Sequence, residues 1–257
     1  MLKRINKRVG VVVMAAGLQG VVAQGAELRP LSTDRPDTTE SPFTVDRGHF
    51  QVEVEMASMT RDGRGESYAL GEMNLKFGIG TDTDLQWVLS SYEHEAGGAE
   101  GFGDMQIRLK QNLWGNEGGE TALAIMPFIQ IPTGSSGVTS GEVEGGIILP
   151  FGIEGSNGWG YGLQAEVDLV ADELSDGHHV EFLASATAAH DLTESLGCFF
   201  ELVGIVGEGA EAGTEAYFNT GLTHALAEQL QLDGGLRVGL TNDSDDFTPF
   251  VGISAKF

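Results

Sequence analysis

The chain has 257 residues, with 38 Asp and Glu against 14 Lys and Arg, a formal net charge of −24 and one cysteine. Such an acidic balance excludes nucleic acid as a partner, because phosphates require a basic footprint, and one cysteine excludes an intramolecular disulfide. Glycine contributes 38 residues and proline only 7, a composition that disfavours helices and is neither collagen-like nor proline-rich.

Residues 1–25 have the layout of a secretory signal peptide. A basic region is followed by an apolar stretch at 9–22 and by small residues at Ala23 and Gly25. The apolar stretch is shorter than the roughly 20 residues that span a bilayer as a helix, so we expect cleavage after Gly25; a retained anchor is the alternative. Cleavage removes four basic residues and leaves 10 Lys and Arg against 38 Asp and Glu, a formal charge of −28.

Residues 26–47 contain three prolines and no sustained periodicity, which predicts an extended segment, not a strand. The segment carries several charged side chains, among them Asp34 and Arg35. If residues 48–257 form a β-barrel, as their alternation of apolar and polar residues predicts, we hypothesise that this segment folds into its mouth as a plug in which Asp34 or Arg35 pairs with interior charges. A free periplasmic tail is an equally open alternative.

Alternation of apolar and polar residues begins at residue 48 and continues to the end of the chain. In the first segment Phe50, Val52 and Val54 face one way while Gln51 and Glu53 face the other, the period of a strand with two unlike faces. We expect twelve strands in all, near 48–60, 66–79, 83–94, 102–115, 119–131, 142–153, 158–170, 178–190, 196–208, 213–224, 229–241 and 247–257. Residues 222–232 also fit the spacing of a short helix, which is kept as an alternative there.

The connections between these strands alternate in character. Those after even-numbered strands are short, and those after odd-numbered strands tend to be longer and acidic, as in outer-membrane barrels with periplasmic turns and extracellular loops. The strand count is even, as expected of a bacterial barrel with both termini on the periplasmic side. The sequence therefore predicts an all-β fold: an antiparallel transmembrane β-barrel of about 12 strands over residues 48–257. A soluble, secreted β-sandwich also alternates and is the competing fold.

The last segment, Phe247 to Phe257, carries its apolar stripe to the final aromatic residue. We expect this strand to pair with the Gln51–Glu55 strand, which closes the ring and removes both sheet edges. Phe257 is then expected at the periplasmic rim, where it serves as the barrel assembly signal.

Four stretches carry a resemblance to a known family: S-T-D-R-P-D-T-T-E-S-P-F-T-V at 32–45, I-Q-I-P-T-G at 129–134, L-Q-L-D-G-G-L-R-V-G-L-T at 230–241, and the terminal F-V-G-I-S-A-K-F. The chain resembles the outer-membrane proteins named for the meta pathway of phenol degradation, some labelled simply transporters. The resemblance covers nearly all of the mature chain and implies a Gram-negative outer-membrane barrel with passage of small molecules. It brings no catalytic residues and does not identify the solute.

The polar face of the strands is expected to line the barrel interior, where charged side chains bias which solutes pass. A satisfied polar interior that conducts nothing is the competing interpretation. The candidate lumen-lining residues are Lys76, Arg108, Lys110, Glu166, Asp168, Glu181, Asp233 and Arg237.

No metal, cofactor or enzymatic activity is expected. His178 and His179 are adjacent and point to opposite faces of a strand, which is poor ligand geometry. The acidic run 242–246 has oxygen ligands but lacks the glycine and distal glutamate of an EF-hand loop. No nucleophile motif is present.

The sequence thus predicts an outer-membrane channel or transporter for small molecules, with aromatic or hydrophobic compounds as candidates. We expect a monomer whose partners are outer-membrane lipids and the barrel-assembly machinery. A structural or adhesin-like barrel without transport is the alternative function.

Overall fold

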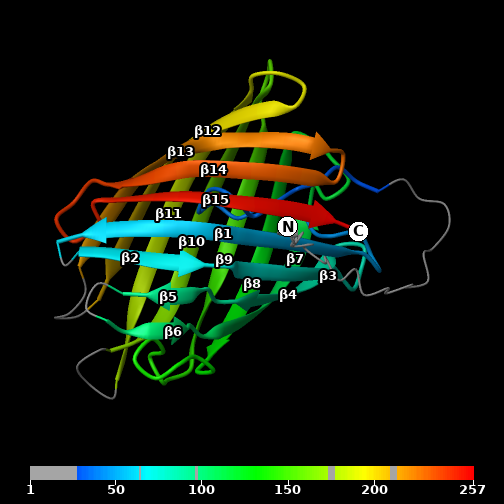
Figure 1. The fold of residues 1–257 in the computed structure, drawn as a ribbon. Helices are drawn as coiled ribbons and strands as arrows, with labels where there is room; N and C mark the ends of the chain where they lie inside the picture. Colours follow the sequence, from blue (N-terminus) through cyan, green and yellow to red (C-terminus); the bar gives the residue numbers. More distant parts are fainter. Residues whose placement is uncertain (1–27, 64, 96–97, 173–176, 209–212) are drawn as a thin grey trace, which may run out of the picture.

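In the computed structural model, fifteen β-strands form one closed antiparallel sheet (Figure 1). The structure describes residues 28–63, 65–95, 98–172, 177–208 and 213–257; the expected signal peptide, 1–25, lies outside these residues. The strands are β1 (Phe50–Asp62), β2 (Gly65–Leu70), β3 (Glu72–Gly78), β4 (Thr83–Leu89), β5 (Tyr92–His94), β6 (Glu100–Phe102), β7 (Met105–Trp114), β8 (Thr121–Ile131), β9 (Glu144–Glu154), β10 (Trp159–Ala171), β11 (His178–Asp191), β12 (Leu196–Gly207), β13 (Thr214–Ala227), β14 (Leu230–Gly239) and β15 (Phe247–Lys256).

Three of the barrel strands are interrupted. β2 and β3 together pair with β1 on either side of Gly71, and β4 with β5 and β6 with β7 are divided in the same way. Joining each pair gives the twelve strands that the alternation predicts. The short helix kept as an alternative at 222–232 is not formed: β13 continues to Ala227 and β14 begins at Leu230, because the two strands pair with each other almost to their ends.

The ring closes between the first and last strands, as predicted. Gln51 lies opposite Lys256 and Glu55 opposite Gly252, and the backbone N–H groups of Phe50 and Phe257 each donate to the carbonyl of the other (3.1 and 2.7 Å). This pairing closes the ring between the first and last strands and excludes the open β-sandwich. In the described part of the chain no helix is long and apolar enough to cross a membrane.

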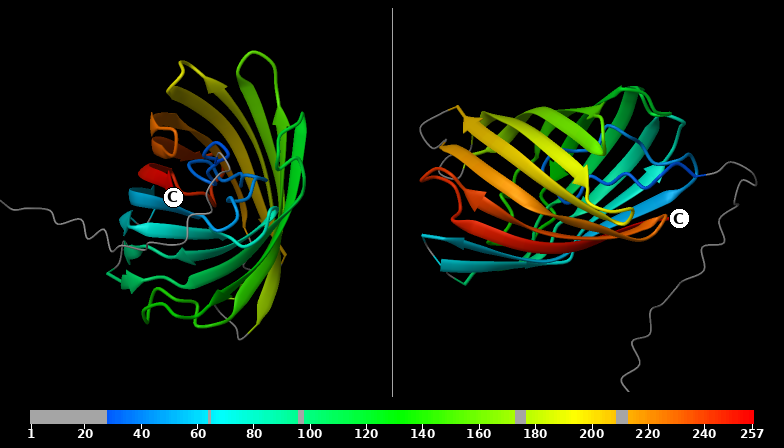
Figure 2. Two further views of the ribbon diagram at one scale, coloured as in Figure 1. Left: turned by 90° about the vertical axis from the view of Figure 1, so that its right-hand side faces the viewer. Right: turned by 90° about the horizontal axis from the view of Figure 1, so that it is seen from above.

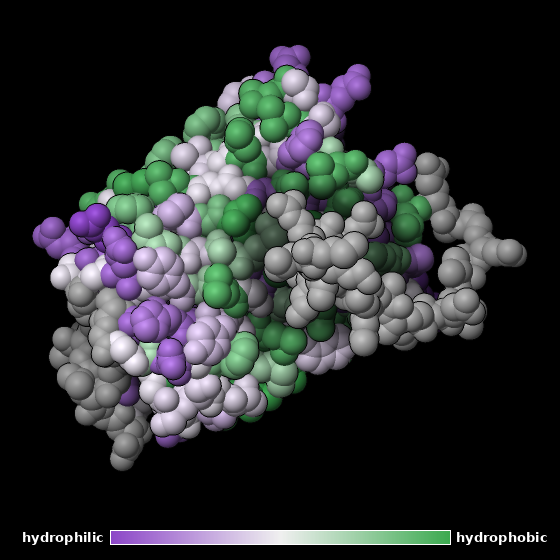
Figure 3. Space-filling view, in the orientation of Figure 1, coloured by the Kyte–Doolittle hydropathy of each residue, from purple (hydrophilic) through white to green (hydrophobic). Residues whose placement is uncertain are grey.

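The faces of the strands are inverted relative to a water-soluble protein. The side chains of Lys76, Lys110, Glu53 and Glu201 are at most 2% exposed, while large apolar residues such as Leu163 are exposed by 36% or more on the outside. Figure 3 shows apolar residues spread over the outer face, with hydrophilic ones at the margins of the view. A polar interior and an apolar exterior match a strand ring surrounded by lipid.

The two ends of the barrel differ. One end of the barrel, called the turn end, has the short turns at 79–82, 115–120, 155–158, 192–195 and 228–229. The start of β1 and the end of β15 lie at this same end. The other end, the loop end, has longer connections such as 132–143 and 240–246, together with the tight turn after β1. Stacked aromatic pairs lie near the turn end, including Phe50–Phe77 and Trp159–Tyr161, the arrangement of an interfacial aromatic girdle.

Candidate functional site

The barrel interior near the turn end is filled by the chain's own N-terminal segment. Residues 28–47, which are called the inner segment, enter at the turn end, cross the lumen and return, and Figure 2 shows them inside the ring (dark blue). At the stem, Arg47 forms an isolated parallel bridge with Gly78. The segment contains no strand because its prolines and polar residues leave the backbone N–H groups free to bond to side chains.

On one side of the lumen, Asp34 lies at the centre of a buried ionic cluster. Its carboxylate pairs with the ammonium groups of Lys76 and of Lys110, the latter at 2.6 Å. Lys76 also pairs with Glu53, and the Glu53 carboxylate accepts the backbone N–H groups of Asp34 (3.0 Å) and Arg35 (3.1 Å). Burial alone would raise the pKa of Asp34, but Lys110 and Lys76 outweigh it and hold that pKa well below its usual range.

Arg35 extends this cluster toward the neighbouring wall. Its guanidinium bonds to Glu55 (3.1 Å) on β1 and to Asp233 (2.9 Å) on β14, and its Cζ atom lies 6.0 Å from the centroid of the Phe250 ring on β15. The residue therefore connects the inner segment to both sides of the seam that closes the barrel.

Residues 34–40 are called the tip of the inner segment. On the opposite wall of the barrel, one carboxylate of β12 binds the far end of this tip. Glu201 accepts the N–H groups of Thr38 (2.9 Å) and Thr39 (2.7 Å) and the Thr39 hydroxyl (2.6 Å), while Asn219 donates to it at 2.7 Å. Desolvation and the charge of Glu201 raise the pKa of the adjacent Asp37 to about 8, so Asp37 is largely protonated at neutral pH.

The returning limb is fixed by β7 and β10. The guanidinium of Arg108 pairs with Glu40 at 2.6 Å, and the backbone N–H of Glu40 donates to Gln164 at 2.7 Å. Together with the Asp34 and Glu201 contacts, this pair attaches residues 34–40 to strands on opposite sides of the ring. The tip therefore spans the lumen as a bar.

Near the turn end the stem of the segment is tied to the rim. Asp46 pairs with Arg29 (2.8 Å) and with Lys256 (3.0 Å), and Lys256 also donates to the backbone oxygen of Arg29 at 2.6 Å. Desolvation raises the pKa of Asp46, but hydrogen bonds from Lys256 and Arg29 outweigh it and lower that pKa. Beside these contacts lies a cavity of about 430 Å³, bordered by Leu31, Phe43 and others.

Beyond the bar, toward the loop end, the interior has two unlike walls. On β10 the carboxylate of Glu166 accepts a hydrogen bond from Gln164 (2.8 Å), and Asp168 follows it on the same face; on β11 Glu181 bonds to His179 (3.2 Å). Further round the ring, on β13 and β15, are aromatic rings: Phe250 packs against Gly235, and Arg237 lies 5.8 Å from the Tyr217 ring centroid.

The sequence-predicted residues thus fall into two groups. Lys76, Lys110, Arg108 and Asp233 contact the inner segment. The described contacts of Glu166, Glu181 and Arg237 are instead with other strand residues, and Asp168 follows Glu166 on the same face of β10. Sequence reasoning singled out Asp34 and Arg35 but missed Glu53 and Glu201 as the groups that receive the segment's backbone. The available signal was the run T-D-R-P-D-T-T, whose N–H groups cannot all enter a helix or sheet and must find acceptors elsewhere.

The described residues contain no group of three or more His, Cys, Asp or Glu side chains placed to hold a metal ion. In the run 242–246, Asp243 accepts the N–H of Thr214 and Ser244 donates to the carbonyl of Ala216. These contacts tie the loop to β13.

Comparison with known proteins gives a family and a fold. A family model described as "Putative MetA-pathway of phenol degradation" matches residues 33–257, and no curated protein sequence matches the chain. Among solved structures, the COG4313 outer membrane channel from Pseudomonas putida F1 has a TM-score of 0.67 at 12% identity, covering 88% of this chain and 100% of that one. The NanC porin (TM-score 0.58, 9% identity) and the KdgM porin in complex with disordered oligogalacturonate (0.52, 10%) each cover 81% of this chain and 100% and 99% of their own.

Proposed function

The chain belongs to the family of the MetA pathway of phenol degradation, and from that premise we propose that it is an outer-membrane channel for small molecules whose inner segment acts as a plug. The observation that carries the proposal is the bar formed by residues 34–40, anchored on β12 by Glu201 and on β1, β3 and β7 by the Asp34 cluster. A barrel that served only as a scaffold would need no ordered constriction across its lumen. The fold shared with the P. putida channel and the two porins supports the same function.

We place the turn end, and with it both termini, on the periplasmic side of the outer membrane. Short turns at one end and longer loops at the other support this orientation. It also puts the cavity of about 430 Å³ beside the stem at the periplasmic mouth. Because the ring closes within a single chain between β1 and β15, we propose that a monomer is the functional unit.

The two unlike walls near the loop end bear on which solutes pass. Tyr217 and Phe250 offer aromatic faces, and the Arg237 guanidinium lies over one of them, while Glu166, Asp168 and Glu181 offer carboxylates. A small aromatic solute with a polar substituent can stack on the first wall and hydrogen-bond to the second. Aromatic or hydrophobic compounds are therefore the solutes we propose.

Single-channel recording in planar bilayers tests this function directly. The full chain is expected to give small, discrete conductance steps, and a variant lacking residues 28–44 is expected to give larger ones because the bar is gone. The variant Arg237→Glu, which keeps the plug, is the matched control: its conductance should stay near that of the full chain while its preference for cations increases.

Two results would contradict the proposal. A closed full-length barrel whose deletion variant also fails to conduct would favour a structural or adhesin-like role. Unchanged conductance in the deletion variant of a conducting barrel would show that the inner segment does not limit the path.

A further inference from the structure

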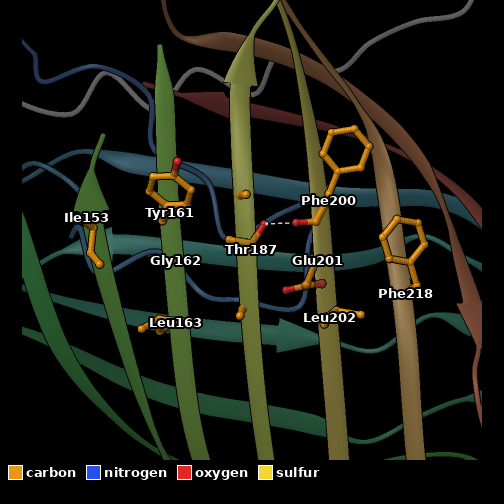
Figure 4. Close-up of a pocket in the computed structure, with 11 residues that line it drawn as sticks. Ile153, Tyr161, Gly162, Leu163, Thr187, Phe200, Glu201, Leu202 and Phe218 are labelled. Atoms are coloured by element: carbon orange, nitrogen blue, oxygen red, sulfur yellow. Dashed lines mark hydrogen bonds between the residues drawn. The ribbon is translucent and has the colours of Figure 1, made fainter. Parts of the chain in front are cut away.

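The outer face of the barrel carries a trough along β11. Three successive outward residues of this strand are alanines, Ala184, Ala186 and Ala188. Their partners on β10 include Leu163 and Tyr161. Their partners on β12 include Leu202 and Phe200. Figure 4 shows these larger side chains on the two strands that flank β11. A depression of about 370 Å³ results, with an almost wholly apolar lining.

The trough continues along β11 beyond the large side chains that flank it on β10 and β12. At the level of Ala184 its neighbours are Ala165 and Gly204, and a methyl group added at Gly204 would meet no atom within 4 Å. At the turn end it stops at His190, whose ring stacks on Trp159 at 4.6 Å. From Ala184 to His190 a strand rises about 20 Å, which at the usual tilt of about 40° corresponds to about 15 Å along the membrane normal. That is half of a hydrocarbon core about 30 Å thick, the depth of one leaflet.

The turn end of the trough is acidic. Glu154, Asp191 and Glu194 are exposed there, and residues 111–236 contain no Lys or Arg. The Nδ1–H of His190 donates to the carbonyl of Gly158 (3.0 Å), so in the neutral ring Nε2 is left as an acceptor. These groups suit a headgroup that donates hydrogen bonds and carries positive charge, and they repel an anionic one.

We propose that this trough binds one acyl chain of an aminophospholipid such as phosphatidylethanolamine, with its ammonium group at Asp191 and His190. The assignment to the periplasmic leaflet rests on the orientation given under the proposed function. A second copy of the chain fits less well, since a two-fold contact would place trough against trough. Lipid A and phosphatidylglycerol are anionic and meet no Lys or Arg from residues 111–236 at this end.

Native mass spectrometry of the full chain tests the site. The barrel is released from mild detergent containing equal amounts of phosphatidylethanolamine, phosphatidylglycerol and lipid A. The wild-type chain is expected to retain one phosphatidylethanolamine, and Ala186→Leu/Ala188→Leu, which fills the trough, is expected to lose it. The matched control is Ala57→Leu: Ala57 is an outward alanine of β1 opposite Val251, five strands away from β11, and its variant should retain the lipid.

A second variant tests the headgroup without altering the trough walls. Glu154→Gln/Asp191→Asn changes two exposed carboxylates and should abolish the preference for phosphatidylethanolamine over phosphatidylglycerol. Heat-modifiable migration shows which variants are folded. The proposal is overturned if the folded wild-type chain retains no lipid, retains lipid A or phosphatidylglycerol preferentially, appears as a dimer at this face, or if the filled trough binds as well as the open one. Conductance is not part of this readout, so a barrel that binds lipid but does not conduct would count only against the channel function.

Discussion

The substitution Asp34→Asn tests whether the ionic cluster holds the plug in the lumen. It is nearly isosteric but removes the negative charge that faces Lys76 and Lys110. Lys76 keeps Glu53 as a partner. Lys110 is 0% exposed, and Asp34 is the carboxylate with which it pairs at 2.6 Å, so the variant leaves a buried ammonium group without that counter-ion.

The size of the effect follows from that buried charge. Removing one partner of a buried ion pair costs about 3–5 kcal/mol, and the remaining amide oxygen recovers about 1 kcal/mol as a neutral acceptor. A net loss of about 2–4 kcal/mol shifts the equilibrium between the seated and released plug by about 30- to 700-fold. Single-channel records of Asp34→Asn should therefore show frequent excursions to the larger conductance of the variant lacking residues 28–44.

Asp37→Asn is the matched control, because it alters another carboxyl of the same tip. Desolvation and Glu201 raise the pKa of Asp37 to about 8, so at pH 6.5 this carboxyl must take up a proton when the plug is seated. An amide removes that cost, so Asp37→Asn should lower the open probability, the opposite of the effect of Asp34→Asn. If Asp34→Asn recordings were indistinguishable from wild type while the protein stayed folded, the cluster would not be what anchors the plug. Equal effects of the two variants would show that the effect does not depend on charge.

Three further predictions follow from the same contacts. The pKa of Asp37 is raised when the plug is seated, so the stability that this carboxyl gives the seated plug is complete below its ordinary pKa near 3.8 and is lost as the pH rises to about 8. The open probability of the wild-type channel should therefore increase over this pH range. Asp37→Asn should remove this pH-dependent increase. Gly78→Ala places a methyl group against the backbone oxygens of Val45 and Asp46 and should destabilise the barrel by about 1–3 kcal/mol, seen as a lower temperature of heat-modifiable unfolding, whereas Gly160→Ala, which meets nothing within 4 Å, should not. Deleting Phe257, whose backbone pairs with Phe50 at the turn-end rim, should reduce the folded protein recovered in the outer membrane, and normal recovery would count against its role as an assembly signal.

Strand positions could be predicted from the sequence because they depend on a local pattern. The expected strand at 229–241 is observed at Leu230–Gly239, and the expected strand at 247–257 is observed at Phe247–Lys256. Alternation of apolar and polar residues with a period of two can be read from neighbouring residues alone. Ring closure between Gln51–Glu55 and the last strand also followed, because an unpaired edge in lipid is too costly to leave open.

The partners of the interior charges could not be predicted in this way. Lys256 and Arg29 are separated by 227 residues, and which residues meet across a barrel depends on the stagger of every intervening strand pair. Arg108 was expected to face a passing solute, whereas the structure gives it Glu40 as a partner. The alternation identifies which residues face inward, but it contains no information about what an incoming segment places beside them.

The distribution of basic residues explains why the inner segment both blocks the lumen and contributes to the stability of the barrel. Strands β8 to β13 contain no Lys or Arg, so Glu201 has no cation on its own strand or on the strands that flank it. The inner segment supplies what the wall lacks: backbone N–H groups and a hydroxyl for Glu201 and a further N–H for Gln164. Removing the segment therefore removes three hydrogen bonds to Glu201 and leaves Asn219 as its described donor, and lost hydrogen bonds to a carboxylate cost more than those to a neutral group. Loss of the plug should open the lumen and lower the stability of the barrel together, and the point variant Asp34→Asn separates the two effects because it leaves the Glu201 contacts in place.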